Sequence, residues 1–304
     1  IIGNHISVGF FIFLIGSFVI GVAATILQVV LNLYLTVCRI GKTTALQRQM
    51  IGGTSNSIGM AIAPLVISYL IFHGTPLHDI VTKQFIIPLI ILILIMLIIT
   101  ILVGKTQMPS IDNVRQVPGE KFDKSVWSFR NLKLGVWGIF FYVGIEVAVG
   151  ANVNMYASEL GGSFASNATH MAALYWGLLL LGRFLGSFIK QVPSEKQLVI
   201  ASIGAIVLLV LAMLMANPWI LTLIGFFHSI MWPAIFTLAT DQLGKYTTKA
   251  SGVLTMGVIG GGIIPLLQGI FADVMGGNWL WTWLLVIAGE AYILYYGLNG
   301  YKQH

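Results

Sequence analysis

Nine apolar stretches, each long enough to cross a lipid bilayer, follow one another along the chain. A transmembrane helix needs about 20 mostly apolar residues to span the hydrocarbon core. Charged residues make up only 9% of the sequence, which is too few to cover a water-soluble surface. The sequence therefore predicts an all-α polytopic membrane protein. The nine stretches are 8–37, 51–72, 85–103, 134–156, 171–189, 198–216, 220–243, 252–275 and 279–298.

Lysine and arginine are distributed unevenly over the two sides of the predicted membrane. If the loop after the first stretch is cytoplasmic, fifteen of the 16 Lys and Arg residues lie on the cytoplasmic side and Lys83 lies on the other. Such an excess marks the cytoplasmic loops of membrane proteins. We therefore expect the longest loop and the C-terminus to be cytoplasmic. The net charge of +6 then needs no nucleic-acid partner.

The longest polar stretch, 104–133, separates three apolar stretches from six. Two six-helix halves joined by a cytoplasmic linker form a common transporter plan. On this plan, residues 1–103 are the remainder of an N-terminal half, 104–133 are the linker, and 134–304 are a complete C-terminal half. Three further helices would then precede the first residue. The alternative is a protein of nine helices with an external N-terminus.

The stretch 134–156 carries a carboxylate, Glu146, near its middle. An ionisable group at the centre of a bilayer costs roughly 3 kcal/mol, and such residues usually face the bundle interior or a wet cavity on an ion or substrate path. Tyr142 and Gly150 share its helix face, and Asn154 lies close to it. We interpret Glu146 as a proton-coupling or substrate-binding group. The alternative is a glutamate that is held by Trp, Tyr or Asn side chains for packing.

Polar residues in the first two stretches also suggest a binding surface. Gln28 and Asn32 lie on one helix face with Thr25 and Thr36, because their spacings are three and four residues. Amide side chains donate and accept hydrogen bonds and so suit a ligand with hydroxyl groups. The alternative is hydrogen bonding between helices. In the second stretch, Asn56 is large enough to reach a cavity.

The C-terminal stretches add further candidates. Trp232 lies one turn after His228, and an indole can stack on the apolar face of a sugar ring, although a core or interfacial Trp is the alternative. Gln268 follows a run that favours a flexible or broken helix and consists of Gly257, Gly260, Gly261, Gly262 and Pro265. We expect Arg183 and Asp241, near cytoplasmic helix ends, to act as conformational latches or anchors.

Glu290 is a second intramembrane carboxylate, which we interpret as structural. The chain contains no H-E-x-x-H or G-x-S-x-G motif and no Asp/His cluster with metal-ligand spacing. Its histidines are isolated and are most simply interfacial. We therefore predict no enzymatic activity, catalytic residue, metal or cofactor.

Six segments together resemble the fucose–galactose–glucose:proton symporter family of the major facilitator superfamily. They are QVVLNLYLTV (28–37), TSNSIGMAIAPL (54–65), FFYVGIEVAVG (140–150), YWGLLLLGRFLGS (175–187), HSIMWPAIFTLATDQLG (228–244) and GGGIIPLLQG (260–269). The resemblance implies the fold of that superfamily, with nine of twelve transmembrane helices present. It also implies proton-coupled hexose uptake by alternating access across the inner membrane.

The resemblance carries over to single positions. In fucose-type members a glutamate that takes part in coupling matches Gln28, so the glutamine here is similar to the glucose/galactose branch. Asn56 matches a sugar-contacting asparagine. The sequence departs from the family where Gly53 replaces a glutamine, Leu33 replaces a proline and His228 replaces an asparagine.

The resemblance leaves the type of transport open. The leading hypothesis is a monomeric symporter of glucose, galactose or fucose, whose partners are the sugar, a proton and the lipid bilayer. A uniporter of the same sugar is the nearest alternative, because Gln28 removes one titratable group. A non-transporting remnant or sensor is the third.

Overall fold

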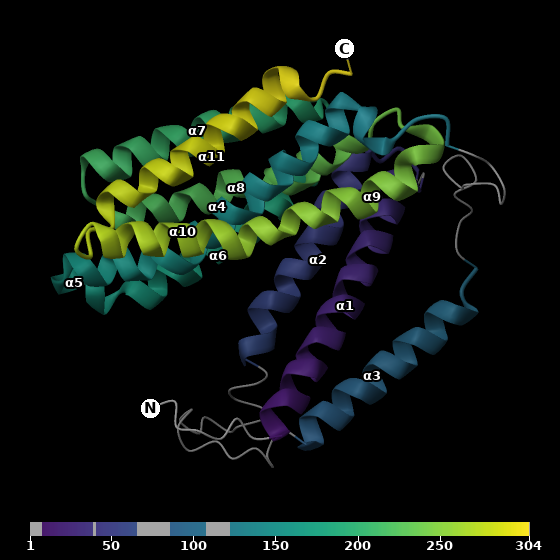
Figure 1. Ribbon diagram of the computed structural model, residues 1–304, viewed down its shortest axis with the longest axis horizontal. Coiled ribbons are helices and arrows are strands. Elements are labelled where there is room, and N and C mark those ends of the chain that lie inside the picture. Colours follow the sequence, from purple (N-terminus) through teal and green to yellow (C-terminus); the bar gives the residue numbers. More distant parts are fainter. Residues whose placement is uncertain (1–7, 39–40, 66–85, 108–121, 304) are drawn as a thin grey trace.

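The computed structural model describes residues 8–38, 41–65, 86–107 and 122–303, and these residues form an all-helical bundle (Figure 1). The longest helix in the described part of the chain is α4, which crosses the centre of the bundle. The longer elements are α1 (Val8–Val37), α2 (Ala45–Leu65), α3 (Ile86–Lys105), α4 (Arg130–Leu160), α6 (Ala168–Gly186), α7 (Ser194–Leu214), α8 (Pro218–Thr240), α9 (Thr247–Thr255), α10 (Gly260–Val274) and α11 (Trp283–Tyr295). A short helix, α5 (Gly162–Ser166), joins α4 to α6.

Each of the nine predicted stretches overlaps a helix in the described part of the chain, so the predicted all-α membrane fold is confirmed. Among the described residues, six helical segments are long and apolar enough to cross a membrane. They are Phe10–Val37, Ile86–Lys105, Arg130–Leu160, Ser194–Leu214, Pro218–Thr240 and Gly244–Val274. The other three predicted stretches correspond to α2, α6 and α11, which are shorter or more polar.

The start of α2 differs from the prediction for a local reason. Hydropathy placed it at Ile51, but the helix begins at Ala45. The Gln47 backbone N–H donates to Thr44 Oγ1 and the Thr44 N–H donates to Gln47 Oε1, both at 3.1 Å. This reciprocal capping box satisfies free N–H groups at a helix start. The cap therefore extends the helix beyond its apolar part, and its predicted end at Phe72 lies outside the described residues.

The predicted helix 252–275 is interrupted where the sequence indicated. α9 gives way to a 3-10 turn, η7 (Met256–Ile259), and α10 begins at Gly260. At this position α10 lies directly against the backbone of α4. A Cβ on Gly260 would lie 1.9 Å from the Phe140 carbonyl oxygen, so only glycine permits this approach.

The core lies among α4, α6, α7, α8, α10 and α11, with α8 packed against α4, α6 and α7. The backbone of α8 approaches α6 so closely at Gly225 that a Cβ there would lie 2.3 Å from the Tyr175 carbonyl oxygen. Large buried side chains such as Tyr142, Tyr175 and Trp283 fill the space between these helices.

Helices α1 and α2 meet this core at one end, which we call the junction. The junction comprises the ends of α1, α6 and α8 and the starts of α2 and α9. There Gln47 Nε2 donates to the Ser187 carbonyl (2.8 Å), and Ser251 Oγ donates to the Val29 carbonyl (3.1 Å). Beyond the junction, α1 and α2 diverge from α4–α11, and α3 has no buried residue among those described (Figure 1).

The contact between α10 and α4 yields a test with a matched control. Gly260→Ala is expected to lower the free energy of unfolding by about 1–3 kcal/mol, because its methyl group must push two helices apart. Gly262→Ala should be neutral or slightly stabilising, since nothing lies within 4 Å of a Cβ there. Thermal unfolding of the detergent-purified variants measures both effects. Equal midpoints for the two variants would contradict this account of the packing.

Candidate functional site

An ion pair between α4 and α6 lies in the interior of the helix bundle. Arg183 Nη2 lies 3.3 Å from Glu146 Oε1, and the two side chains are 10% and 12% exposed. Arg183 also donates from Nη1 to Ser57 Oγ of α2 at 2.7 Å. Each charge therefore compensates the other away from bulk water. The guanidinium therefore links its own helix, α6, to two others, α4 and α2, and α2 lies on the N-terminal side of the junction.

The partner of Glu146 is not one of the Trp, Tyr or Asn residues that the packing alternative named. Arg183 lies 37 residues away on another helix, and hydropathy does not reveal which side of that helix faces Glu146. The sequence predicts that Arg183 lies near a helix end and acts as a latch or anchor. The described geometry adds a direct contact with the intramembrane carboxylate, which sequence spacing gave no means to detect.

Aromatic side chains lie beside this ion pair. Tyr142 is fully buried one turn before Glu146, and its hydroxyl lies near both members of the pair without completing a hydrogen bond. Its ring lies 6.4 Å from that of Trp232, which stacks on Phe236 with ring centroids 6.1 Å apart. The buried Asn154 Oδ1 also lacks a hydrogen-bond partner. The Tyr142 hydroxyl therefore has unused polar capacity close to an apolar ring surface.

A second polar cluster lies deeper among α6, α8 and α11. His228 Nε2 lies 2.6 Å from Glu290 Oε1, and both side chains are 0% exposed. His228 Nδ1 lies 2.6 Å from the Tyr175 hydroxyl, which also lies 3.1 Å from the Glu146 carbonyl oxygen. The interpretation of His228 as interfacial is therefore wrong. His228 lies in the core because α6, α8 and α11 bury their apolar faces against one another and because its partner, Glu290, lies on α11.

The polar face of α1 is used partly for packing. Gln49 Nε2 of α2 donates to the Asn32 carbonyl (2.8 Å) and to Thr36 Oγ1 (2.9 Å). Asn32 is buried, whereas Gln28 is exposed. Of the polar side chains on this face, Thr36 therefore bonds to α2, which is the hydrogen-bonding role that the sequence left open, whereas Asn32 contributes only its backbone carbonyl.

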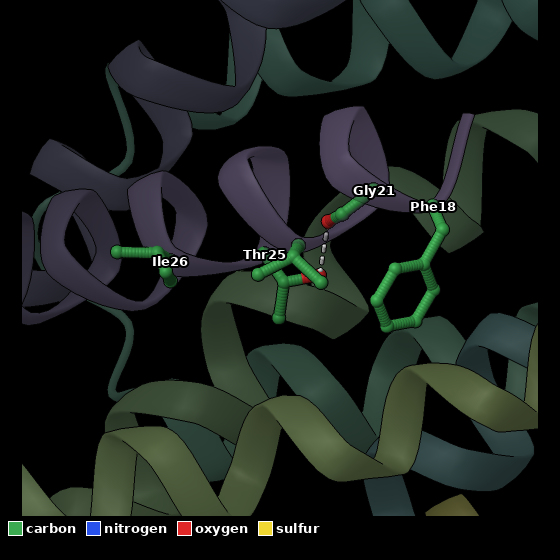
Figure 2. Close-up of a pocket in the computed structure, with 5 residues that line it drawn as sticks. Phe18, Gly21, Thr25 and Ile26 are labelled. Carbon is green, nitrogen blue, oxygen red and sulfur yellow. Dashed lines mark hydrogen bonds between the residues drawn. The ribbon is translucent and has the colours of Figure 1, made fainter. Parts of the chain in front are cut away.

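A cavity of about 410 Å³ lies along α1 (Figure 2). Figure 2 shows Thr25, whose hydroxyl donates to the Gly21 carbonyl of the same helix at 2.8 Å. All five lining residues, Phe18, Gly21, Val22, Thr25 and Ile26, belong to α1. Because one helix alone cannot enclose a ligand and the ion pair lies elsewhere, we do not place the site in this cavity.

The remaining candidates lie apart from the ion pair. Gln268 is buried and bonds to Asn152 Nδ2 (2.9 Å) and Thr282 Oγ1 (3.1 Å). Asn152 of α4, which is not among the predicted site residues, is thus a direct partner of Gln268. Asn56 is exposed on α2 beside Ser57. Asp241 is exposed at the end of α8 and lines a cavity of about 230 Å³ at the junction.

Comparison with known proteins identifies the family. Residues 2–263 match the model of the Major Facilitator Superfamily. A putative glucose/galactose transporter of Helicobacter pylori (strain J99) is 33% identical over 312 residues, which cover 98% of this chain and 75% of that protein. The glucose/galactose transporter of Brucella abortus (strain 9-941) is 34% identical over 301 residues, covering 96% and 72%.

More distant relatives agree. The L-fucose-proton symporter of Escherichia coli K12 is 26% identical over 292 residues, covering 87% of this chain and 66% of that protein. The crystal structure of the transporter FucP in the outward conformation has a TM-score of 0.76 and 23% identity, and it covers 90% of this chain and 72% of that one. The predicted resemblance and fold are thus confirmed. The chain belongs to the Major Facilitator Superfamily of membrane transporters and is not an enzyme.

Proposed function

We propose that the protein is a secondary active transporter that takes up a hexose together with a proton by alternating access. Glucose and galactose are the favoured substrates, because relatives at 33–34% identity are named as glucose/galactose transporters, and fucose is the next candidate. Uniport of the same sugar is the second candidate function. It is favoured by Gln28, a residue that cannot titrate.

The observation that carries the proposal is the interior ion pair between Glu146 and Arg183. A carboxylate and a guanidinium form strong, charge-assisted hydrogen bonds with hydroxyl groups. The unpartnered Tyr142 hydroxyl lies beside them, and the partly exposed Trp232 offers an apolar face on which a sugar ring can stack. Glu146 is also the proton-coupling candidate, because protonation would remove the charge that holds Arg183.

The other candidates complete the proposed path in two groups. Gln28, Asn32 and Asn56 would contact the sugar from α1 and α2, and Asn154 would contact it from α4. His228 and Gln268 already use their polar atoms inside the bundle. They would therefore have to exchange these partners in order to bind a sugar directly.

We propose the domain division 1–103, 104–133 and 134–304. Its support is that α4–α11 pack among themselves, whereas α1 and α2 contact them chiefly at the junction. We propose that the junction, the linker and the C-terminus lie in the cytoplasm and that the protein lies in the inner membrane, which the excess of Lys and Arg supports. The described state is then closed to the cytoplasm. A monomer suffices, since both sides of the path come from one chain.

Arg183 is proposed as the latch that links the carboxylate to this closure. It holds Glu146 with one nitrogen and Ser57 of α2 with another. Protonation of Glu146 leaves the guanidinium without its counter-ion, which changes its hold on α2. Asp241, which lines the junction cavity, is a second latch candidate.

The proposed function is tested with cells that express the complete reading frame. Sugars are added one at a time to a lightly buffered, de-energised suspension while the external pH is recorded. Glucose or galactose is expected to raise the external pH, because each sugar enters with a proton. A constant pH with equilibration of labelled sugar would instead indicate a uniporter. Neither signal for any hexose would contradict sugar transport and favour a non-transporting sensor.

Glu146→Gln is expected to abolish the sugar-induced pH rise and to reduce the accumulation ratio to about one, since an amide cannot take up the proton. Glu159→Gln is the matched control, because Glu159 lies on the same helix but is exposed near its end. Thermal unfolding verifies that both variants are folded. Proton-driven accumulation by Glu146→Gln at the wild-type level would remove Glu146 from the coupling role.

Ser57→Ala is expected to favour opening of the junction, because Arg183 loses a buried hydrogen bond worth about 1.5–3 kcal/mol. The reporter is Thr240→Cys in a Cys38→Ser background, since Thr240 is 4% exposed and lines the junction cavity. Its modification by a maleimide should be about tenfold faster in Ser57→Ala. Ser55→Ala is the control, because the Ser55 hydroxyl bonds only to its own helix. Equal rates in the two variants would contradict the latch.

A further inference from the structure

Glu290 takes no part in the mechanism proposed above, and His228 enters it only as a candidate sugar contact, yet together they place two titratable groups at zero exposure. The distance between His228 Nε2 and Glu290 Oε1 is 2.6 Å, so a hydrogen lies between the two atoms. The second carboxylate oxygen, Oε2, is buried and has no hydrogen-bond partner among the residues that the structure describes. A purely structural pair would be expected to satisfy both oxygens of an ionised carboxylate.

Counting hydrogens shows that this cluster has two self-consistent states. In the first, His228 is neutral with its hydrogen on Nε2 and donates to the Glu290 carboxylate. Nδ1 then accepts the hydrogen of the Tyr175 hydroxyl, 2.6 Å away. The His228–Glu290 pair carries a net charge of −1 in this state.

In the second state the cluster holds one more proton. Nδ1 now carries a hydrogen and donates to the Tyr175 oxygen, so Tyr175 turns its own hydrogen to the Glu146 carbonyl oxygen at 3.1 Å. One hydrogen is still shared between Nε2 and Oε1, and the net charge of the pair is zero. Both acceptors that Tyr175 needs for these two orientations are therefore already in place.

The charged groups that face the cluster, Glu146 and Arg183, are already paired with each other. The titratable groups that face the cluster are Tyr175 and Arg183 from α6 and Tyr142 and Glu146 from α4. Other helices also pack against α8. Their charged residues, such as Arg48, Glu195 and Lys196, lie near the starts of those helices. Because Arg183 is already paired with Glu146, the first state leaves one uncompensated negative charge in a medium of low dielectric constant.

We propose that His228 and Glu290 form a second proton-binding site, which takes up one proton through the Tyr175 hydroxyl. The site itself stands on geometry alone. Its role in transport rests on the proposed function, in which it would supply a titratable group that the N-terminal helices lack at Gln28. The protonation of His228 sets whether the Tyr175 hydroxyl donates to His228 or to the Glu146 carbonyl oxygen. Proton uptake is therefore linked to the sugar site.

Infrared difference spectroscopy of the purified full-length protein tests proton binding without any sugar. Spectra at acidic and alkaline pH are subtracted for the wild type and for Glu290→Gln. The wild type is expected to show a pH-dependent carboxyl or imidazole band that Glu290→Gln lacks or shows at a shifted pH midpoint. Identical difference spectra for the two proteins would overturn the proposal.

Reconstituted vesicles test the role in transport. With Glu290→Gln, sugar accumulation driven by a pH gradient should fall to equilibrium, while exchange of labelled sugar at equal pH should fall less than about twofold, because exchange needs no net proton movement. Accumulation at the wild-type level would overturn the transport role. If the wild type neither accumulates nor exchanges any hexose, the proposed function fails. The infrared result then decides alone whether the proton site exists.

A second variant covers the case in which Glu290→Gln does not fold. Tyr175→Phe keeps the His228–Glu290 pair but removes the hydroxyl, so proton-coupled uptake should be about tenfold slower than in the wild type. Tyr156→Phe is the matched control, because Tyr156 is equally buried and its hydroxyl has no hydrogen-bond partner. Equal uptake rates in the two variants would overturn the route through Tyr175.

Discussion

Charge is unfavourable inside a bilayer unless another charge or a hydrogen bond compensates it, and the interior of this transporter is organised around that constraint. Glu146 is paired with Arg183, and Glu290 is paired with His228. Tyr175 connects the two pairs through the His228 ring and the Glu146 carbonyl. A change of one proton in either pair alters what the other groups in this network can bond to. The same pairing that makes burial tolerable therefore makes the network responsive to protons.

Close helix packing is what brings these groups within reach of one another. Gly260 allows α10 to lie against the α4 backbone, and Gly225 allows α8 to lie against α6. A larger side chain at Gly260 would push α10 away from α4, which carries Glu146, and one at Gly225 would separate α6 from α8, which carry Tyr175 and His228. The distance of 2.6 Å between Tyr175 and His228 thus depends on Gly225, a residue that has no polar chemistry of its own.

The junction has a different character from the core. The contacts across it combine the buried side chains of Leu46 and Met50 with a few hydrogen bonds to backbone carbonyls, such as those from Gln47 and Ser251, and with Arg183 on Ser57. Such hydrogen bonds are individually worth about 1 kcal/mol, or more where a charged group takes part. On the proposed mechanism, this contact surface forms and breaks during the transport cycle while the core of α4–α11 stays packed. Arg183 takes part in both the junction, through Ser57, and the core, through Glu146.

The sequence by itself determined the membrane class, the approximate positions of the helices and the place of Glu146 midway along α4, because hydropathy and helical periodicity are local properties. It also brought out Arg183, His228 and Trp232 as candidates, although it misjudged the setting of His228. Only the tertiary structure decided which of these groups meet. Glu146 and Arg183 are 37 residues apart, and His228 and Glu290 are 62 apart. Which helix faces approach one another depends on steric fit between separate helices, at glycines and aromatic side chains, and periodicity along a single helix carries no record of that fit.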